Sequence, residues 1–524
     1  MTNTKKLGLF ALIALVISSS IGAGIFDLTA SLAAAGTAGP ALIAWAIVFV
    51  GFLAMVLSIN FIVKNKPEVD GLIAYAKEGF GNFWGFVSGW GYWLSCWLGN
   101  IAFATVLMGA VAGIVSAAGS EFLGDPATVL NWQALIIASV VMWLIALLVY
   151  SGIKSASVVN AVVMVAKLIP LAVFLIIAIV AFKAGAFTTD FWGNVFANAK
   201  ATATGFDFKT VWAQVNGSFM VLLWVFVGIE GATIFTSRAQ KRSEAAKATI
   251  IGFIVLVVVY VFISLLPFGM MSHSELVKLS SPVLGQIMKK EVGSWGVVFI
   301  NTGLTISILG AWLSWTMLPV EAVQTMADHK LLPSVWGKMN AKGTPVFALF
   351  LTTILCQIFV FTLHFPKLMI AGSSAYEFAF GLCASAILVC WLFIGLFQMK
   401  LAVGMKKYAW LIAGLIAAAF QIWMMVVSGM NYLIIVLILY IPGVILYLYR
   451  RAKEAGGITT LDWVGSIVFA LVGVVLIVML AVNYEKGMAF LGKPGPTWII
   501  TAVFVILSVV GVFMPRKEGK ALTE

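Results

Sequence analysis

The chain has 524 residues, of which 62% are hydrophobic and only 10% are charged, and its mean hydropathy is +1.08. Because soluble domains usually carry about 25% charged residues, this composition excludes a water-soluble globular protein. The net charge of +12 does not indicate nucleic-acid binding, because lysines and arginines alternate between successive loops instead of gathering on one basic face. The sequence therefore predicts an all-α polytopic membrane protein.

Windows of about 20 apolar residues, the helix length that crosses roughly 30 Å of hydrocarbon, predict about 14 transmembrane helices. Their centres lie near residues 21, 51, 100, 141, 170, 224, 258, 310, 355, 386, 416, 440, 472 and 505. Lysines and arginines are concentrated in the loops on the side of the N-terminus, which predicts that both termini are cytoplasmic. The first apolar run is too long for the hydrophobic region of a signal peptide, so we interpret it as a retained span.

Glycines and serines interrupt the first span, in the sequence Ser18-Ser19-Ser20-Ile21-Gly22-Ala23-Gly24-Ile25-Phe26. Backbone that is not helical persists at membrane depth only where it is buried in protein or lines a polar cavity, because hydrocarbon offers no hydrogen-bond partners. A second interruption, Gly228-Ile229-Glu230-Gly231, lies in the sixth span. Paired breaks in corresponding helices of two halves are typical of an inverted-repeat transporter with a binding site near the bilayer midplane.

Two ionisable residues accompany these breaks. Lys167 lies in the fifth span, where a lysine normally faces a cavity or a partner rather than lipid. Its ammonium either occupies a cation position at the helix breaks, where it titrates, or forms a structural ion pair or snorkels to the interface. Glu230 lies beside the second break, where it either senses protons or caps the exposed amides of a helix end.

No pattern in the sequence indicates catalysis. The third span, from Trp84 to about Val115, carries aromatic and polar residues near its middle, which favours a wall that faces a lumen. The four cysteines lie within apolar segments and form no CxxC motif, so neither a metal site nor a disulfide framework is indicated. Walker, GxSxG and HExxH motifs are absent from the sequence. We therefore expect no enzymatic activity, no catalytic residue, no cofactor and no metal.

Five motifs carry a family resemblance: Gly22-Ala23-Gly24-Ile25-Phe26, Trp93 to Asn100, Lys167-Leu168-Ile169-Pro170, Gly228-Ile229-Glu230-Gly231-Ala232 and Leu313-Ser314-Trp315-Thr316-Met317-Leu318-Pro319. Together they resemble the amino acid, polyamine and organocation transporter superfamily, and within it the basic amino acid and polyamine antiporters. The resemblance implies a LeuT-like, five-plus-five inverted-repeat fold. It places a transport core in residues 1–400, with repeats over about 8–183 and 210–400, and additional helices in residues 401–524.

In that superfamily, freed N–H groups of the first break hold the substrate α-carboxylate, and freed carbonyls of the sixth helix hold the α-amino group. The dipoles of helix ends agree with this arrangement. The resemblance implies a substrate-binding set of Ser20, Ile21, Gly22, Ala23, Gly24, Asn100, Phe103, Trp224, Gly228, Ile229 and Trp315. It also implies gating or proton-coupling roles for Tyr92, Lys167 and Glu230, with Lys167 resembling a lysine that replaces a bound sodium ion in relatives.

The sequence departs from the family pattern in three ways. Ala23 stands where many relatives have serine, Asp27 follows the break where many have an apolar or amide residue, and about 14 spans exceed the usual number of twelve. We include Asp27 in the substrate-binding set, because an intramembrane carboxylate there attracts the side-chain cation of a basic substrate. The alternatives are that Asp27 caps the second half-helix or pairs with Lys167.

The sequence thus predicts a bacterial inner-membrane antiporter. It would exchange a cationic or imidazole amino acid such as arginine, lysine or histidine for a metabolic product such as ornithine or an amine. Phe103, Trp224 and Trp315 would contact the substrate cation through their ring faces. The alternatives are a proton-coupled symporter and, more remotely, a receptor or channel that does not transport by coupled turnover. The expected partners are small amino acids and amines and the lipid bilayer, without nucleic acid, and the last four spans are expected to form scaffold or the surface of a homodimer.

Overall fold

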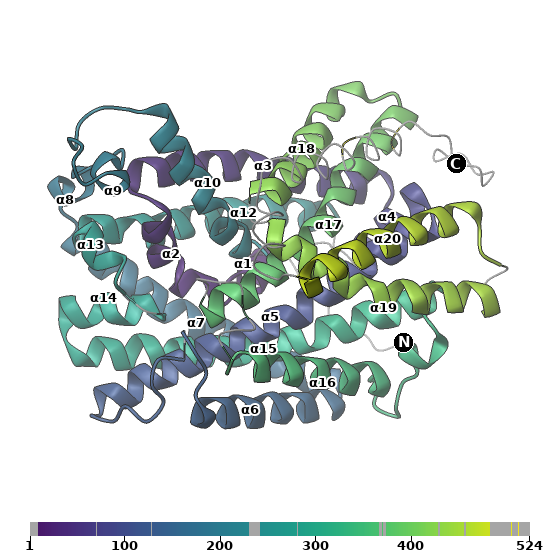
Figure 1. Ribbon diagram of the computed structural model, residues 1–524, viewed down its shortest axis with the longest axis horizontal. Coiled ribbons are helices and arrows are strands. Elements are labelled where there is room, and N and C mark those ends of the chain that lie inside the picture. The colour runs from purple at the N-terminus through teal and green to yellow at the C-terminus, as the bar shows by residue number, and fades with distance from the viewer. Residues whose placement is uncertain are drawn as a thin grey trace.

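The computed structural model of the protein describes residues 9–69, 71–126, 128–229, 242–279, 281–365, 369, 374–427, 430–454, 457–482, 505 and 512. Within these ranges the chain is helical apart from turns and loops, and the β contact that occurs is an isolated bridge between Met339 and Pro345. Many of the long helices run roughly along the horizontal axis of Figure 1. Such a bundle satisfies its backbone hydrogen bonds within each helix, as a membrane requires.

The first half of the chain forms α1 (Leu9–Ser20), η1 (Gly24–Phe26), α2 (Leu28–Ala35), α3 (Ala38–Asn65), α4 (Gly71–Phe80), α5 (Asn82–Ala117), α6 (Trp132–Tyr150), α7 (Ile153–Ala181), α8 (Ala184–Thr188), α9 (Asn194–Ala197) and α10 (Phe208–Trp224). The rest of the described chain forms α12 (Arg242–Leu265), η3 (Leu266–Gly269), α13 (His273–Leu276), α14 (Val283–Val292), α15 (Ser294–Asp328), η4 (Ser334–Gly337), α16 (Val346–Thr362), α17 (Ala375–Gly404), η6 (Tyr408–Trp410), α18 (Leu411–Val427), α19 (Met430–Glu454) and α20 (Thr460–Val482).

The helices agree with the predicted spans. Eight helices of the described chain are long and apolar enough to cross a membrane, and shorter apolar helices accompany them at Lys167–Ala181, Val346–Thr362 and Thr460–Leu471. Every predicted centre from residue 51 to residue 472 falls within a helix. The all-α polytopic fold is therefore confirmed. The predicted span near residue 505 lies, apart from Val505 and Val512, outside the described residues.

Helices α5, α15 and α17 form the centre of the bundle. The apolar window of α17 is buried along its whole length, so this helix is enclosed by protein rather than by lipid. Helix α5 packs against both α15 and α17. Gly99 on α5 permits a close approach to α15, because a Cβ atom at this position would lie only 2.6 Å from the indole ring of Trp315.

The two interrupted helices are neighbours. Helix α2, which follows the first break, packs against α10, which ends at the second, and α1 packs against α12. Both breaks therefore lie in one region beside the central bundle. The fold positions them for a shared site.

Candidate functional site

The first break has the predicted position. Helix α1 ends at Ser20, residues 21–23 are not helical, and one 3-10 turn precedes the start of α2 at Leu28. The backbone N–H groups of Gly22 and Ala23 donate no hydrogen bond to any residue that the structure describes. The break therefore presents backbone donors at the start of η1, where an anionic group is favoured.

Two side chains from other helices bind the carbonyl groups at the end of α1. The Nζ atom of Lys167 on α7 donates to the carbonyl of Ile21 at 2.8 Å, and the hydroxyl of Tyr260 on α12 donates to the carbonyl of Ser20 at 2.8 Å. Lys167 is only 4% exposed. The C-terminal end of a helix carries partial negative charge, so a cation is stabilised there. Lys167 thus lies at the first break, as one of the two predicted alternatives requires.

The second break begins where α10 ends. Residues 225–229 form turns after Trp224, and Gly228 has a φ angle of +110°, which side chains rarely adopt. The N–H of Ile229 donates to the carbonyl of Phe226 at 3.0 Å. The helix therefore stops at the expected place, whereas Glu230 lies outside the described residues.

Three aromatic rings from three helices surround the first break. The ring centroids of Phe103 and Trp315 are 5.5 Å apart, and those of Trp224 and Trp315 are 6.1 Å apart. The indole Nε1 of Trp224 donates to the hydroxyl of Tyr376 on α17 at 3.0 Å, which fixes its orientation. Between the rings and the break lies a cavity of about 20 Å³, lined by Ser20, Gly22, Ala23, Gly24, Ile25, Phe103, Trp224, Val225, Val227, Tyr260 and Trp315.

This cavity is closed. A volume of about 20 Å³ holds roughly one water molecule and is far too small for an amino acid. The indole of Trp224 covers Gly24 so closely that a Cβ atom there would lie 2.7 Å from the ring. A substrate of amino-acid size therefore requires Trp224 or its neighbours to move away from the break.

A family model for amino acid permeases matches residues 7–442. The chain belongs to this family. The predicted superfamily is thereby confirmed, and the permease is a multi-pass membrane protein of a transporter family. Its relatives include the arginine/ornithine antiporter ArcD1 of Lactococcus lactis subsp. cremoris, which is 41% identical over 98% of both chains. An arginine/ornithine antiporter of Latilactobacillus sakei is 42% identical over 88% of this chain and 96% of its own length. One from Pseudomonas aeruginosa is 38% identical over 90% of this chain and 95% of its own.

Asp27 of the permease is buried and contacts a part of the chain that its predicted roles did not name, while its role in substrate binding stays a prediction. Its carboxyl group accepts hydrogen bonds from the Ser281 hydroxyl at 2.6 Å and from the Val283 N–H at 3.2 Å. It makes no capping bond to α2, and it does not line the closed cavity. Asp27 instead joins the first break to the start of α14.

The remaining predicted residues do not line the cavity. Ile21 contributes its carbonyl to Lys167, and Ile229 is buried within the second break. Asn100 donates from Nδ2 to the carbonyl of Trp315 at 3.2 Å, so it contacts the backbone of an aromatic wall residue. Tyr92 is buried on α5 but does not line the cavity.

Sequence reasoning missed two tyrosines of the permease site. Tyr260 lines the cavity and binds Ser20, and Tyr376 orients Trp224. Both are fully or almost fully buried. A buried tyrosine hydroxyl normally has a hydrogen-bond partner, so the isolated Tyr260 within an apolar run was a signal of a polar neighbour. The sequence does not indicate which neighbour that is.

Proposed function

We propose that this permease exchanges arginine for ornithine across the bacterial cytoplasmic membrane, with its termini on the cytoplasmic side. The observation that carries the proposal is the similarity to antiporters named for this exchange, at 38–42% identity over 88–98% of the chain. Lysine and histidine, which the sequence also allowed, lack such relatives among those described above.

The geometry of the first break supports an amino-acid substrate. The backbone N–H groups of Gly22 and Ala23 are available to the α-carboxylate, with Ser20, Ile21 and Gly24 shaping the same turn. The backbone around Gly228 and Ile229 would receive the α-amino group. These roles extend the dipole argument for helix ends to the two breaks.

The aromatic rings support a cationic side chain. Phe103, Trp224 and Trp315 present ring faces and edges around the cavity within about 6 Å of one another. A guanidinium or ammonium over such a ring gains about 0.5–2 kcal/mol, depending on how completely it is desolvated. Arginine and ornithine carry a cation at similar distances from a shared α-amino acid group. The same three aromatic rings can therefore accept both side chains.

Exchange also requires the closed cavity to open alternately to each side. We infer that the interrupted helices α1–α2 and α10 move relative to α5, α6, α15 and α16, as in other inverted-repeat transporters. Substrate binding would displace Trp224 from Gly24 and thereby change the packing between these two groups of helices. The cavity volume of about 20 Å³ represents the closed state of this cycle.

Transport into liposomes tests the proposal. Purified protein is reconstituted, and uptake of radiolabelled arginine is measured into vesicles that contain ornithine, arginine or no amino acid. We expect uptake only into loaded vesicles, unchanged by a protonophore. Equal uptake into empty vesicles under an imposed proton gradient would instead support the symporter, with Lys167 and Glu230 as the titrating groups. Absence of uptake under every condition would leave the receptor, whereas uptake that depends neither on a loaded amino acid nor on a proton gradient would indicate a channel. Unlabelled lysine and histidine, added as competitors, define the substrate range.

A further inference from the structure

Tyr376 lies at the start of α17, directly beside the ring that closes the cavity. Its side chain is only 3% exposed, and its hydroxyl accepts the hydrogen bond from Nε1 of Trp224 at 3.0 Å. A Cβ atom at Gly24 would lie 2.7 Å from this same nitrogen. One indole ring therefore contacts the first break and the Tyr376 hydroxyl at the same time.

The first turn of α17 holds Tyr376 in place. Ser374 and Glu377 form a capping box, in which each side chain accepts a hydrogen bond from the backbone N–H of the other residue, at 3.1 and 2.9 Å. The ring of Tyr376 packs against Phe380, one turn further along the helix, with ring centroids 4.9 Å apart. The position of the hydroxyl is thus set by α17 itself, so it stays in place when Trp224 moves.

The movement of Trp224 that a substrate requires breaks its hydrogen bond to Tyr376. The cavity is too small for an amino acid while the indole covers Gly24. The space that the indole vacates is bounded by its former contacts, which include the Tyr376 hydroxyl, Phe380 and Trp315. A buried hydroxyl that loses its donor costs free energy unless another donor replaces it. Opening is therefore favoured by a ligand that brings a donor to Tyr376.

The wall of the closed cavity does not itself supply an anionic acceptor for a cationic side chain. The described residues that line it include no acidic side chain. Its tyrosine, Tyr260, binds the carbonyl of Ser20, and the ammonium of Lys167 binds the next carbonyl along the chain. A second cation is disfavoured beside this ammonium, because like charges repel each other. The hydroxyl of Tyr376 belongs to a different helix and is the acceptor that the movement of Trp224 uncovers.

We propose that Tyr376 determines substrate specificity, because its hydroxyl accepts a hydrogen bond from the cationic side chain of the substrate in exchange for that of Trp224. The ammonium of ornithine or the guanidinium of arginine takes the place of the indole N–H, while the α-carboxylate binds at the first break. A hydrogen bond from a charged donor is stronger than one from a neutral indole, so the exchange favours a cationic ligand. The choice of ornithine and arginine rests on the proposed function, whereas the role of the hydroxyl rests on the contacts of Trp224.

Two amino acids of equal length test this role. L-Norleucine has the shape of L-ornithine with a methyl group in place of the ammonium, so the ratio of their affinities isolates the contribution of the cation. Equilibrium binding of radiolabelled ornithine to the purified full-length protein, and its displacement by norleucine, give both affinities. We expect the native protein to prefer ornithine, because norleucine leaves the Tyr376 hydroxyl without a donor.

Three variants separate recognition of the substrate from positioning of Trp224. Tyr376→Phe removes the hydroxyl and keeps the ring, and the affinity ratio should fall at least about tenfold, because a hydrogen bond from a charged donor is lost. Trp224→Phe breaks the same hydrogen bond but leaves the Tyr376 hydroxyl in place. We expect it to keep the ratio within about threefold, the difference between the cation–π contacts of the two rings. Tyr408→Phe removes a hydroxyl from an exposed tyrosine of η6 and should match the native protein.

The two proposals fail in different ways. An unchanged ratio in Tyr376→Phe, or an equal fall in Trp224→Phe, would overturn the role of Tyr376 and leave exchange in liposomes unaffected. A tenfold fall in Tyr376→Phe, combined with native protein that does not exchange the two amino acids, would contradict the proposed function alone. A thermal unfolding scan shows whether Tyr376→Phe is folded. Equal affinities of the native protein for ornithine and norleucine would also overturn the role, so the test does not depend on one variant.

Discussion

At the scale of single residues, the first break depends on a few polar contacts from distant helices. Lys167 and Tyr260 bind consecutive carbonyl groups at the end of α1, and each reaches them from a different helix. These carbonyls accept no hydrogen bond within a helix. The two side-chain hydrogen bonds therefore stabilise the non-helical backbone of the break. The transport activity should therefore be sensitive to Lys167, although this side chain does not line the cavity.

Lys167→Met tests this dependence. The substitution keeps most of the side-chain length but removes the ammonium from the Ile21 carbonyl, a hydrogen bond of 2.8 Å from a charged donor. Loss of such a bond corresponds to about a tenfold or larger decrease in arginine uptake by reconstituted protein. Lys183→Met, which changes an exposed lysine before α8, is the control and should transport normally. Native uptake by Lys167→Met would show that the break does not need this cation.

Gly24→Ala tests the contact between the break and Trp224. The added Cβ atom would lie 2.7 Å from the indole, so the ring must shift before the closed cavity can form. We expect a KM for arginine that is at least about threefold higher, since one misplaced aromatic contact is worth roughly 1 kcal/mol. Gly185→Ala places its Cβ in open space and should leave the KM unchanged. Equal kinetics for the two variants would mean that Trp224 adapts without consequence.

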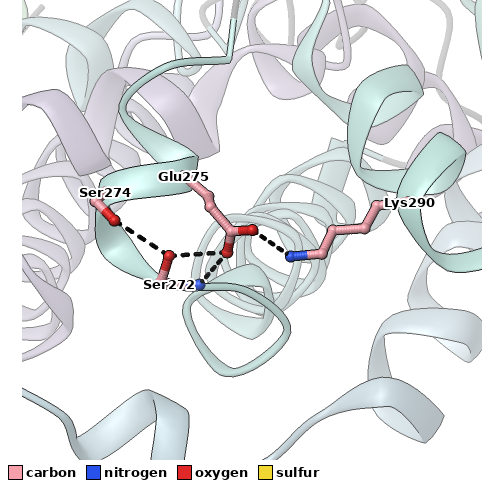
Figure 2. Close-up of polar contacts among 4 residues, drawn as sticks. All are labelled: Ser272, Ser274, Glu275 and Lys290. Atoms are coloured by element: carbon pink, nitrogen blue, oxygen red, sulfur yellow. Dashed lines mark hydrogen bonds and ion pairs between the residues drawn. The ribbon is translucent and has the colours of Figure 1, made fainter.

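Glu275 gives a prediction for pH. Its pKa is lowered from the ordinary value of 4.5 to about 2, chiefly by the hydrogen bond from the Lys290 ammonium at 2.8 Å, which Figure 2 shows. A carboxyl group with a lowered pKa stabilises the folded state above the unfolded value and loses this effect as the pH falls toward the folded value. The melting temperature of the native protein should therefore exceed that of Glu275→Gln above pH 5, and the difference should shrink between pH 4.5 and pH 2. A difference that stays constant across this interval would exclude the ion pair.

The sequence predicts some of these residues better than others. The aromatic residues and the glycines of the break could be predicted because their types and order resemble a known family. The partner of Asp27 could not, because Ser281 lies 254 residues away and belongs to a loop without a recognisable pattern. The alternatives considered for Asp27 were a cap on the following half-helix and a pair with Lys167, and neither named the loop before α14 that donates its hydrogen bonds.

At the scale of elements, the interrupted helices were predictable and their connections were not. Runs of apolar residues and glycines are local signals, so α1, η1, α2 and α10 agree with the sequence. The placement of α13 and α14 depends instead on tertiary contacts such as the bond between Ser281 and Asp27. This bond ties the loop before α14 to the interrupted helix.

Ser281→Ala tests this connection between elements. It removes one of two donors to a carboxyl group that is only 2% exposed. We expect the free energy of unfolding to fall by about 2 kcal/mol, because the hydrogen bond is buried and its acceptor is left with one donor. Ser274→Ala changes an exposed serine within α13 and should alter stability by less than about 0.5 kcal/mol. Equal free energies of unfolding for the two variants would mean that the hydrogen bond between Ser281 and Asp27 does not stabilise the fold.

At the scale of the whole molecule, composition and hydropathy predict the fold class, and the family match confirms the superfamily. They do not predict the conformational state, because open and closed forms share one sequence and differ by small changes in packing. The closed cavity of about 20 Å³ is accordingly a property that only the structure provides. The division into repeats over residues 8–183 and 210–400, and the homodimer, stay predictions.

The most direct measurement of the central claim counts both amino acids in one experiment. Liposomes that contain the protein are loaded with ¹⁴C-labelled ornithine and placed in ³H-labelled arginine, and entry and exit are followed together. The proposed exchange predicts that one ornithine leaves for each arginine that enters, at every imposed pH gradient. Arginine entry without ornithine exit, or a ratio that changes with the pH gradient, would contradict it.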